Sequence, residues 1–499
     1  MDRRSFVTST AALSALSFAR PSWANTETVA ATVHTREGVG NLPHVWEECA
    51  GSDRAAITLR ESWRRDLDRW RNEIGLKRVR FHGIFNDELG VYAPSIQNMG
   101  RSAPNFQNIF EVYDGLTARG ASPFVELGFM PKKLASGSAT FGFYNGNITP
   151  PKSMEAWAQF IGTFVRALVD RYGIAAVRNW PFEVWNEPNL TFFWTGNQQQ
   201  YFDLYKATAV AIKSVDPQLQ VGGPATSDGA WIGEFAAYCS QNNAPVDFFA
   251  THCYAGDKKE GVSVNDAIPY TIGKVRQIID ASSFKGRPLW LSEWSSDSPA
   301  MIAHVVKHCL PHVRGMSHWT LSGTYEELGV MDVVFKEGDN GWPAMYRGIA
   351  RPSFNTYKLL HALGTQRLQA DGPVLASRRS DGSVAAVVWN LAEAQQAAGI
   401  PGASAVRTVT GSPKVLKVQF AGQRPGATAK VSFVDQERGS PMPAWRAMGS
   451  PQYLTQAQMA KLRVAADIAP PTTMRLGADS SLSLQLPPEG VALIEIAKG

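Results

Sequence analysis

The sequence lacks cysteine pairs and long apolar runs. Only four of its 499 residues are cysteines, namely Cys49, Cys239, Cys253 and Cys309, and none belongs to a Cys-x-x-Cys pair. This excludes a disulfide-rich scaffold and the common zinc-ribbon pattern. We expect four buried thiols, with a single disulfide as the alternative in an exported protein. No apolar run approaches the roughly 20 residues of a membrane-spanning helix, so no membrane span is expected.

The sequence also lacks a strong charge and a phosphate-binding loop. The formal net charge is +5, and the pattern Gly-x-x-x-x-Gly-Lys-Ser/Thr is absent. A charge this small and dispersed does not favour nucleic acid as a partner. Hydrophobic residues make up 44% and charged residues 19% of the chain, which is typical of a globular protein.

Three histidines have a spacing that resembles a metal site. His304, His308 and His312 follow one another at intervals of four residues, and such histidines share one face of a helix. Pro311 interrupts the helix before the third histidine, and no carboxylate accompanies the set in the sequence. We therefore expect neither a metal nor a cofactor.

Residues 1–24 have the organisation of an export signal. Arg3 and Arg4 come first, a mildly apolar stretch covers residues 11–19, and Ala24 ends a small-x-small cleavage motif. Paired arginines with weak hydrophobicity resemble a twin-arginine signal, and a plain signal peptide is the alternative. Cleavage removes three arginines and one aspartate, which lowers the formal charge from +5 to +3. We predict an exported protein, periplasmic or secreted.

Residues 41–363 alternate between strand-like and helical patterns. Runs such as 78–81 and 123–127 have the length of buried strands, whereas residues 62–74 carry apolar side chains at helical spacing. About eight such alternations predict an α/β fold, a (β/α)8 barrel (TIM barrel) with its site at the carboxyl ends of the strands.

Residues 364–499 have a different pattern. Short β runs such as 384–389 and 491–496 alternate with turns rich in glycine, proline and aspartate, which predicts an accessory all-β domain, a β-sandwich. Residues 441–471 lack this alternation and are predicted to form a helical insert or a long loop. Residues 25–40 are assigned to an N-terminal segment before the barrel.

Two glutamates follow apolar strands in aromatic surroundings. Glu187 lies in Trp-Asn-Glu-Pro after the fourth expected strand, and Glu293 lies in Ser-Glu-Trp after the seventh. Because the carboxyl ends of barrel strands meet at one face, we expect both carboxyls in one site. A glycosidase needs one carboxyl as proton donor and another as nucleophile or base. For either glutamate alone, the alternative is a cap or an ion pair in a loop.

The chain resembles glycoside hydrolase family 39, a family of barrel glycosidases. The resemblance covers about residues 40–365 and rests on these two motifs and on the segments 80–92, 252–254, 318–320 and 326–327. It implies that Glu187 is the acid/base and Glu293 the nucleophile of a retaining hydrolase. The substrate-binding residues that it implies are His82, Asn186, His252, Tyr254, Trp319, Glu326 and Glu327.

The resemblance also implies a specificity. It indicates an exo-acting β-xylosidase that cleaves xylo-oligosaccharides during xylan degradation. It also implies that residues 25–40 add a strand to the β domain. Gly323 stands where relatives commonly have aspartate, and residues 339–343 replace a glycine-rich loop. Both departures lie where the sugar is selected. The alternatives are therefore an endo-acting enzyme or one acting on exopolysaccharide, arabinose- or uronic-acid-containing substrates, and then a non-catalytic carbohydrate-binding protein, which the two glutamates disfavour.

Overall fold

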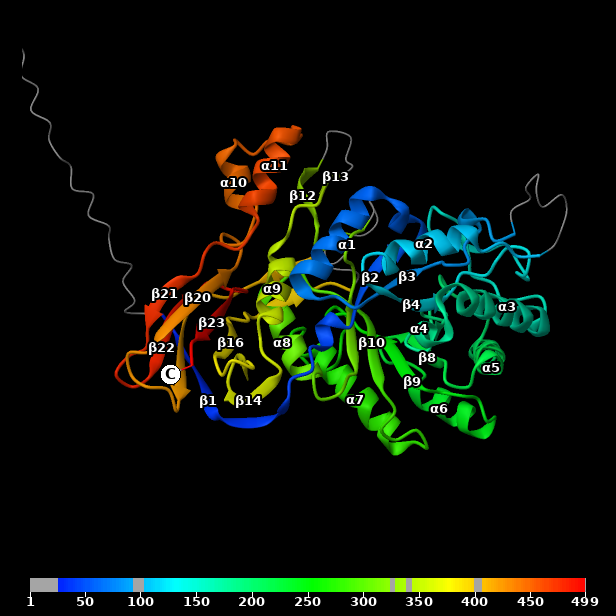
Figure 1. Ribbon diagram of the computed structural model, residues 1–499, viewed down its shortest axis with the longest axis horizontal. Helices are drawn as coiled ribbons and strands as arrows, with labels where there is room; N and C mark the ends of the chain where they lie inside the picture. The colour runs from blue at the N-terminus through cyan, green and yellow to red at the C-terminus, as the bar shows by residue number, and fades with distance from the viewer. Residues whose placement is uncertain (1–25, 93–102, 324–327, 338–342, 399–405, 499) are drawn as a thin grey trace, which may run out of the picture.

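The larger part of the molecule is a closed barrel of eight parallel strands. The computed structural model describes residues 26–92, 103–323, 328–337, 343–398 and 406–498. The barrel strands follow the spatial order β10-β11-β2-β3-β4-β7-β8-β9 (Figure 1). Their bounds are β2 (Cys49–Arg54), β3 (Arg78–His82), β4 (Ser122–Leu127), β7 (Pro181–Val184), β8 (Gln220–Ser227), β9 (Phe248–His252), β10 (Leu289–Trp294) and β11 (Gly315–His318). The predicted (β/α)8 barrel is confirmed.

Helices surround the barrel and connect its strands. They are α1 (Glu61–Ile74), α2 (Gln107–Thr117), α3 (Met154–Tyr172), α4 (Ile174–Val177), α5 (Gln198–Val215), α6 (Ile232–Gln241), α7 (Ala267–Ala281), α8 (Pro299–Cys309) and α9 (Pro352–His361), with the short 3-10 helices η2 (Val45–Glu47), η3 (Ala55–Leu59) and η4 (Asp87–Leu89). Helix α3 begins at Ser153, whose side chain accepts a hydrogen bond from the Ala156 N–H. Helix α1 ends at Gly75, whose φ of 76° is a left-handed conformation that glycine adopts readily.

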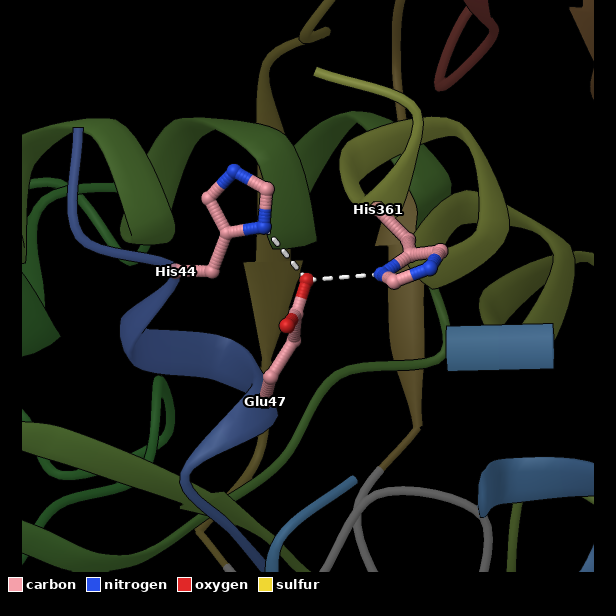
Figure 2. A group of neighbouring side chains, drawn as sticks. All are labelled: His44, Glu47 and His361. Carbon is pink, nitrogen blue, oxygen red and sulfur yellow. Dashed lines mark hydrogen bonds and ion pairs between the residues drawn. The ribbon is translucent and has the colours of Figure 1, made fainter. Parts of the chain in front are cut away.

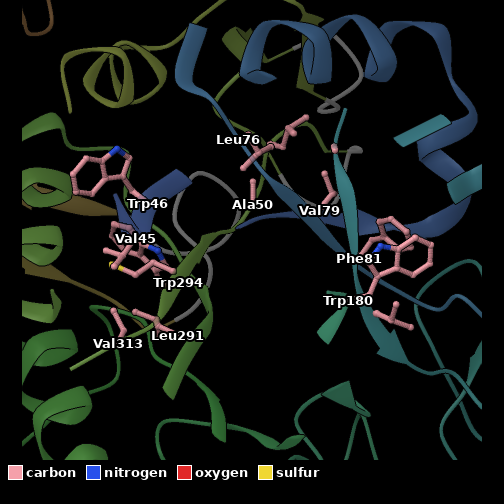
Figure 3. Close-up of a cluster of buried hydrophobic side chains, with 14 of the residues drawn as sticks. Val45, Trp46, Ala50, Leu76, Val79, Phe81, Trp180, Leu291, Trp294 and Val313 are labelled. Carbon is pink, nitrogen blue, oxygen red and sulfur yellow. The ribbon is translucent and has the colours of Figure 1, made fainter. Parts of the chain in front are cut away.

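An apolar core lies between the barrel and its helices. The apolar side chains of α1, namely Trp63, Leu67, Trp70 and Ile74, are all buried. Figure 3 shows part of this core, in which Ala50, Val79 and Leu291 of three barrel strands lie in one cluster with Trp46 and Trp294. Burial of apolar surface stabilises such contacts by roughly 25 cal/mol per Å². The helical spacing read from residues 62–74 therefore marks the face that packs on the barrel.

The second part of the molecule is a nine-stranded sheet in the order β21-β20-β23-β16-β15-β14-β1-β19-β22. Its strands are β1 (Thr28–Asn41), β14 (Gln366–Asp371), β15 (Val374–Arg378), β16 (Val384–Trp389), β19 (Lys414–Ala421), β20 (Thr428–Val434), β21 (Thr472–Arg475), β22 (Ser481–Leu486) and β23 (Val491–Ile496). Val431 of β20 and Leu484 of β22 come from opposite ends of this order but share one apolar cluster. The sheet therefore folds over its own core as a sandwich does, and the predicted all-β domain is confirmed.

The remaining elements are short. Helices α10 (Met442–Ala447) and α11 (Gln456–Ala465) lie at the top of Figure 1, beside the hairpin of β12 (Asp332–Glu337) and β13 (Pro343–Arg347). Two further hairpins join β5 (Thr140–Phe141) to β6 (Gly146–Asn147) and β17 (Ala394–Gln396) to β18 (Arg407–Val409). All four cysteines are free and buried. Among the residues described, no helix is both long enough and apolar enough to cross a bilayer.

Candidate active site

Glu187 and Glu293 come together at the carboxyl end of the barrel. Glu187 follows β7, the fourth barrel strand, and Glu293 lies in β10, the seventh. Both residues are buried, with 6% and 4% of their surface exposed. An oxygen atom of one carboxyl lies within 4.8 Å of an oxygen atom of the other. Two motifs that are far apart in the sequence thus form one site.

The backbone at Glu187 has an uncommon conformation. The φ angle is 40° at Glu187 and 72° at Trp185, values that residues with side chains rarely adopt. The Glu187 N–H donates to the carbonyl of Ala225 at 2.9 Å, and Trp185 Nε1 donates to the carbonyl of Phe193 at 2.9 Å. These bonds hold the turn after β7. Burial raises the pKa of the Glu187 carboxyl to about 7, so it keeps its proton where an ordinary glutamate is ionised.

Glu293 has different neighbours. Tyr254 Oη donates a hydrogen bond to Glu293 Oε1 at 2.5 Å, and Arg80 Nη1 donates to Oε2 at 3.2 Å. Both partners are donors and one carries a positive charge, which suits a carboxylate at this position. The two carboxyls of the site therefore have unlike surroundings.

His252 lies between the two glutamates. Its Nδ1 is 3.0 Å from Glu187 Oε1 and 3.3 Å from Glu293 Oε2, and its Nε2 is 3.3 Å from Arg80 Nη2. Because a guanidinium group only donates, Nε2 accepts and the ring proton is on Nδ1. Burial lowers the pKa of His252 to about 4. The ring is therefore neutral, and its one N–H points at the two carboxyls.

Arg80, which the sequence analysis did not identify, is the centre of the buried charge network. Its guanidinium donates to Glu183 Oε2 at 2.6 Å and to Asn186 Oδ1 at 2.9 Å, and lies 3.0 Å from Glu126 Oε2. Burial lowers the pKa of Arg80, but the surrounding carboxylates outweigh burial and raise it above its ordinary value. A signal was present in the sequence: Arg78, Arg80 and His82 alternate with Val79 and Phe81 along β3, which places the three polar side chains on one face of the strand.

His82 and Trp319 lie together on one side of the site. His82 Nδ1 pairs with Glu126 Oε2 at 2.8 Å. Burial lowers the pKa of His82, but the Glu126 charge outweighs burial and raises it to about 9. The ring centroid of His82 lies 4.5 Å from that of Trp319, 5.7 Å from that of Phe193 and 6.3 Å from that of Phe129. The sequence analysis missed these two phenylalanines, which add apolar ring faces beside His82.

Asn186 has one polar atom available to a ligand. Its Oδ1 accepts from Arg80, whereas its buried Nδ2 has no hydrogen-bond partner among the described residues. Leaving a buried amide donor unpaired costs free energy. A substrate hydroxyl at this position would complete its hydrogen bonding.

Glu326 and Glu327 lie outside the described residues. Asp332, which the sequence analysis did not single out, contacts the chain on both sides of them. Its Oδ2 accepts from the Gly323 N–H at 2.7 Å and from the Gly329 N–H at 3.1 Å. Gly323 is the position at which the family resemblance leads us to expect aspartate. A carboxylate is thus present near this position, but it comes from β12.

Neither the site nor the histidines of α8 have the character of a metal centre. Glu187, His252 and Glu293 have ligand atoms within 4.8 Å of one another, but the Arg80 guanidinium already supplies a positive charge 3.2 Å from Glu293 Oε2, and like charges repel. The rings of the α8 histidines His304 and His308 lie 4.2 Å apart, but His304 Nε2 pairs with Asp266 and His308 Nδ1 lies 2.8 Å from the His304 carbonyl oxygen. The helix ends before His312.

The arrangement can move a proton and make a covalent bond at the same time. One buried carboxyl keeps its proton near neutral pH, while the other is surrounded by donors at a distance of a few ångströms. Two titratable groups whose environments differ in this way can act as acid and as nucleophile or base. Aromatic faces and a free amide donor lie beside them.

Comparison with known proteins connects this geometry to a family. The family model described as glycosyl hydrolases family 39 matches residues 29–479. A β-xylosidase of Geobacillus stearothermophilus is 34% identical over 481 residues, covering 90% of this chain and 92% of the relative. A β-xylosidase of Caldicellulosiruptor saccharolyticus is 34% identical over 464 residues, covering 88% and 91%. A solved structure of a monomeric β-xylosidase from Caulobacter crescentus CB15 has a TM-score of 0.79 and 32% identity, covering 94% of this chain and 99% of that one.

Proposed function

Because the chain belongs to glycoside hydrolase family 39, whose members are retaining O-glycosyl hydrolases, we propose that it is an exported, exo-acting β-xylosidase that acts on xylo-oligosaccharides. Family membership makes carbohydrate the substrate class. The two β-xylosidases at 34% identity support xylose as the sugar. The observation that carries the reaction is the pair of buried carboxyls within 4.8 Å of each other in unlike environments.

The separation of the carboxyls supports retention of configuration. Retaining glycosidases hold their two carboxyls about 5 to 5.5 Å apart, whereas inverting enzymes leave roughly 6.5 to 9.5 Å for a water molecule. Oxygen atoms of Glu187 and Glu293 lie within 4.8 Å, which leaves no such room. In the proposed mechanism Glu293 attacks the sugar directly.

The reaction then proceeds in two displacements. A Glu293 oxygen bonds to the anomeric carbon while the bond to the leaving oxygen breaks, and Glu187 gives that oxygen its proton. Glu187, now a carboxylate, takes a proton from water, whose oxygen attacks the anomeric carbon and releases Glu293. His252 directs its N–H to both carboxyls, and Tyr254 holds Glu293 in position for attack.

The other residues of the site are assigned to substrate binding. We assign the unpaired Nδ2 of Asn186 to the sugar 2-hydroxyl, a contact that strengthens as positive charge develops on the ring. His82 and Trp319 are assigned to the face of the same sugar, because their rings lie together beside the carboxyls. We also propose that Glu326 and Glu327 bind sugar hydroxyls, and this proposal rests on the family resemblance alone.

Exo action is supported by contacts among the loops after the first three barrel strands. Arg54, at the end of β2, pairs with Glu88 at 3.0 Å, and its guanidinium lies 4.7 and 4.8 Å from the ring centroids of Phe143 and Tyr144. Asn86 Nδ2 donates to the Tyr144 carbonyl at 3.2 Å. These loops form one connected wall, which suits a pocket for a chain end better than an open groove.

The roles of the glutamates are tested with the variants Glu187→Ala and Glu293→Ala on a nitrophenyl β-xyloside. The kcat of each variant should fall by about 10⁴-fold or more. The two glutamates act as a unit, so the loss of either one removes most of the rate enhancement that they give together. In Glu187→Ala, azide should restore turnover and give the β-xylosyl azide, since the nucleophile is intact. In Glu293→Ala, azide should act by one displacement and give the α-azide, as proton magnetic resonance of the products would reveal.

Two results would contradict this proposal. The same anomer from both variants would remove the assignment of acid and nucleophile. A wild-type protein that hydrolyses an arabinoside or a uronide faster than the β-xyloside would keep the mechanism but replace the sugar.

Export is proposed from residues 1–24, which lie outside the described residues. The support is the pair Arg3-Arg4 and the small-x-small motif that ends at Ala24. Replacing both arginines by lysine keeps the charge but removes the pairing that the twin-arginine pathway recognises. We expect an uncleaved precursor in the cytoplasm, measured by immunoblot of cell fractions. Normal cleavage of this variant would indicate a plain signal peptide.

A further inference from the structure

Two histidines and a glutamate converge at the amino end of the barrel, opposite the candidate active site. His44 lies just before η2, Glu47 is the last residue of η2, and His361 ends α9. Figure 2 shows both imidazole rings directed at the Glu47 carboxylate from two sides. This cluster, His44–Glu47–His361, takes no part in the proposed hydrolysis.

The ligand atoms of the cluster are close and accessible. Glu47 Oε1 lies 2.5 Å from His44 Nδ1 and 2.8 Å from His361 Nδ1, and all three atoms lie within 4.8 Å of one another. The side chains of Glu47 and His44 are 10% and 13% exposed, whereas that of His361 is 42% exposed. Solvent can therefore reach the cluster from the His361 side.

Both ring nitrogens of His44 face oxygen atoms that accept hydrogen bonds. Its Nε2 faces the carbonyl oxygen of Gly364 at 3.4 Å, and its ring stacks on Trp46 with centroids 4.6 Å apart. The Glu47 carboxylate, 2.5 Å from Nδ1, and this carbonyl oxygen both only accept, so without a metal Nδ1 carries the proton directed at Glu47. A cation would displace that proton, and Nε2 would then donate to the carbonyl. In metal sites a ligating histidine commonly gives its other N–H to a carbonyl in this way, which fixes the tautomer.

We propose that His44, Glu47 and His361 bind a divalent transition cation, with Zn²⁺ as the best match. Two imidazole nitrogens and one carboxylate oxygen are ligands that zinc accepts at about 2.0 to 2.2 Å, with water in the fourth position. Calcium and magnesium prefer sites made of oxygen atoms. The cation would replace the protons now shared between the rings and Glu47, and the ligand atoms would need to separate by less than about 1 Å.

The position of the cluster indicates what the cation would do. The chain passes from β1 into the barrel near His44 and leaves the barrel for β14 just after His361. These two crossings already touch, since the Leu42 N–H donates to the Thr365 carbonyl at 2.7 Å. A cation bound to both would fasten the junction of the barrel with the β domain. A ligand that binds only the folded state raises the free energy of unfolding with the logarithm of its excess over Kd.

The test is zinc binding to the mature chain after treatment with a chelator, measured by titration calorimetry. We expect one strong equivalent in the wild type and at least about 100-fold weaker binding in His361→Ala, since even the loss of an outer partner costs 10- to 100-fold. The melting temperature of the wild type should rise by a few degrees at about a hundredfold excess over Kd, and that of His361→Ala should not.

Controls separate this cluster from other candidate ligands. The double variant His304→Ala/His308→Ala removes the histidines of α8 and should keep the strong equivalent. Glu47→Gln keeps the shape of the side chain but weakens a ligand, so the visible spectrum of bound Co²⁺ should lose intensity. The proposal is overturned if no strong equivalent exists, if it persists in His361→Ala, or if it disappears only with the α8 histidines. Persistence in His361→Ala together with inhibition of hydrolysis would place the metal at the catalytic glutamates instead.

Discussion

The two ends of the barrel interior differ, although the same strands line both. At the amino end the inner side chains Cys49, Phe124, Phe248, Ala250 and Trp290 form an apolar cluster. The ring of Phe124 lies 6.0 Å from that of Phe248 and 5.1 Å from that of Trp290. Two residues further along β4 the inner side chain is Glu126, and two residues beyond Ala250 on β9 it is His252. The inner side chains thus change from apolar to charged or titratable within two residues, which is one repeat of a β-strand.

The difference between the ends teaches how the barrel supports buried charge. Burying an ion costs several kcal/mol unless partners compensate it, and the carboxyl end meets this cost with the contacts of Arg80 to Glu126, Glu183 and Glu293. At the amino end the inner side chains are those of the apolar cluster. The free energy of unfolding should therefore depend on both ends of the barrel, whereas catalysis should depend on the carboxyl end.

The largest effect is expected from Arg80→Met. Glu126 and Glu183 would lose their shared cation, which should cost about 3 to 5 kcal/mol of unfolding free energy. Glu293 and Asn186 would also lose a donor, so kcat/KM should fall by about 10²- to 10³-fold. Urea unfolding and steady-state kinetics measure the two effects.

Arg78→Met is the matched control for this prediction. Arg78 lies two residues earlier on β3, at the apolar end, where Nη1 donates to Glu48 Oε2 at 2.7 Å. Its loss should change kcat/KM by less than about threefold, because Glu48 keeps Lys77 and Arg314 as partners and distant sites act nearly independently. Equal catalytic losses in the two variants would mean that the ends of the barrel are not functionally distinct.

Phe124→Ala should affect stability without affecting chemistry. The side chain is 1% exposed between two aromatic rings, and truncation of such a residue costs about 3 to 5 kcal/mol. At a temperature where the variant is folded, kcat should lie near the wild-type value. Phe124→Leu, which leaves a smaller cavity, should lose less stability. A large fall of kcat in folded Phe124→Ala would contradict the separation of the two ends.

The smallest effect is a dependence on pH at the carboxyl end. Burial raises the pKa of Glu187 to about 7, and the acid must be protonated to act. The kcat/KM value should therefore fall as pH rises through about 7, by tenfold per pH unit. In Glu187→Gln, assayed with an activated substrate that needs no acid, this alkaline limb should disappear. Persistence of the limb would assign it to another group.

The barrel was predictable because its strands and helices repeat a local pattern. Glu187 and Glu293 were predictable as one site because each follows an apolar strand, and the ends of barrel strands meet. Asn186, His252 and Tyr254 were named from the family resemblance. The structure places His252 and Tyr254 in contact with these carboxyls and Asn186 in contact with Arg80. Arg80 could not be ranked in the same way, since an arginine within a strand is also compatible with a role at the protein surface.

The sequence by itself determined the order of the elements and the positions of the two glutamates, because both depend on side chains that are neighbours along the chain. Only the tertiary structure decided which charges meet. Arg80 contacts Glu183 and Glu293 because closure of the barrel brings β3, β7 and β10 around one axis. Glu47 meets His361 because α9, the last helix before the β domain, returns to the start of the first barrel strand, β2. Ion pairs depend on distance in space, and that distance exists only after the chain has closed on itself.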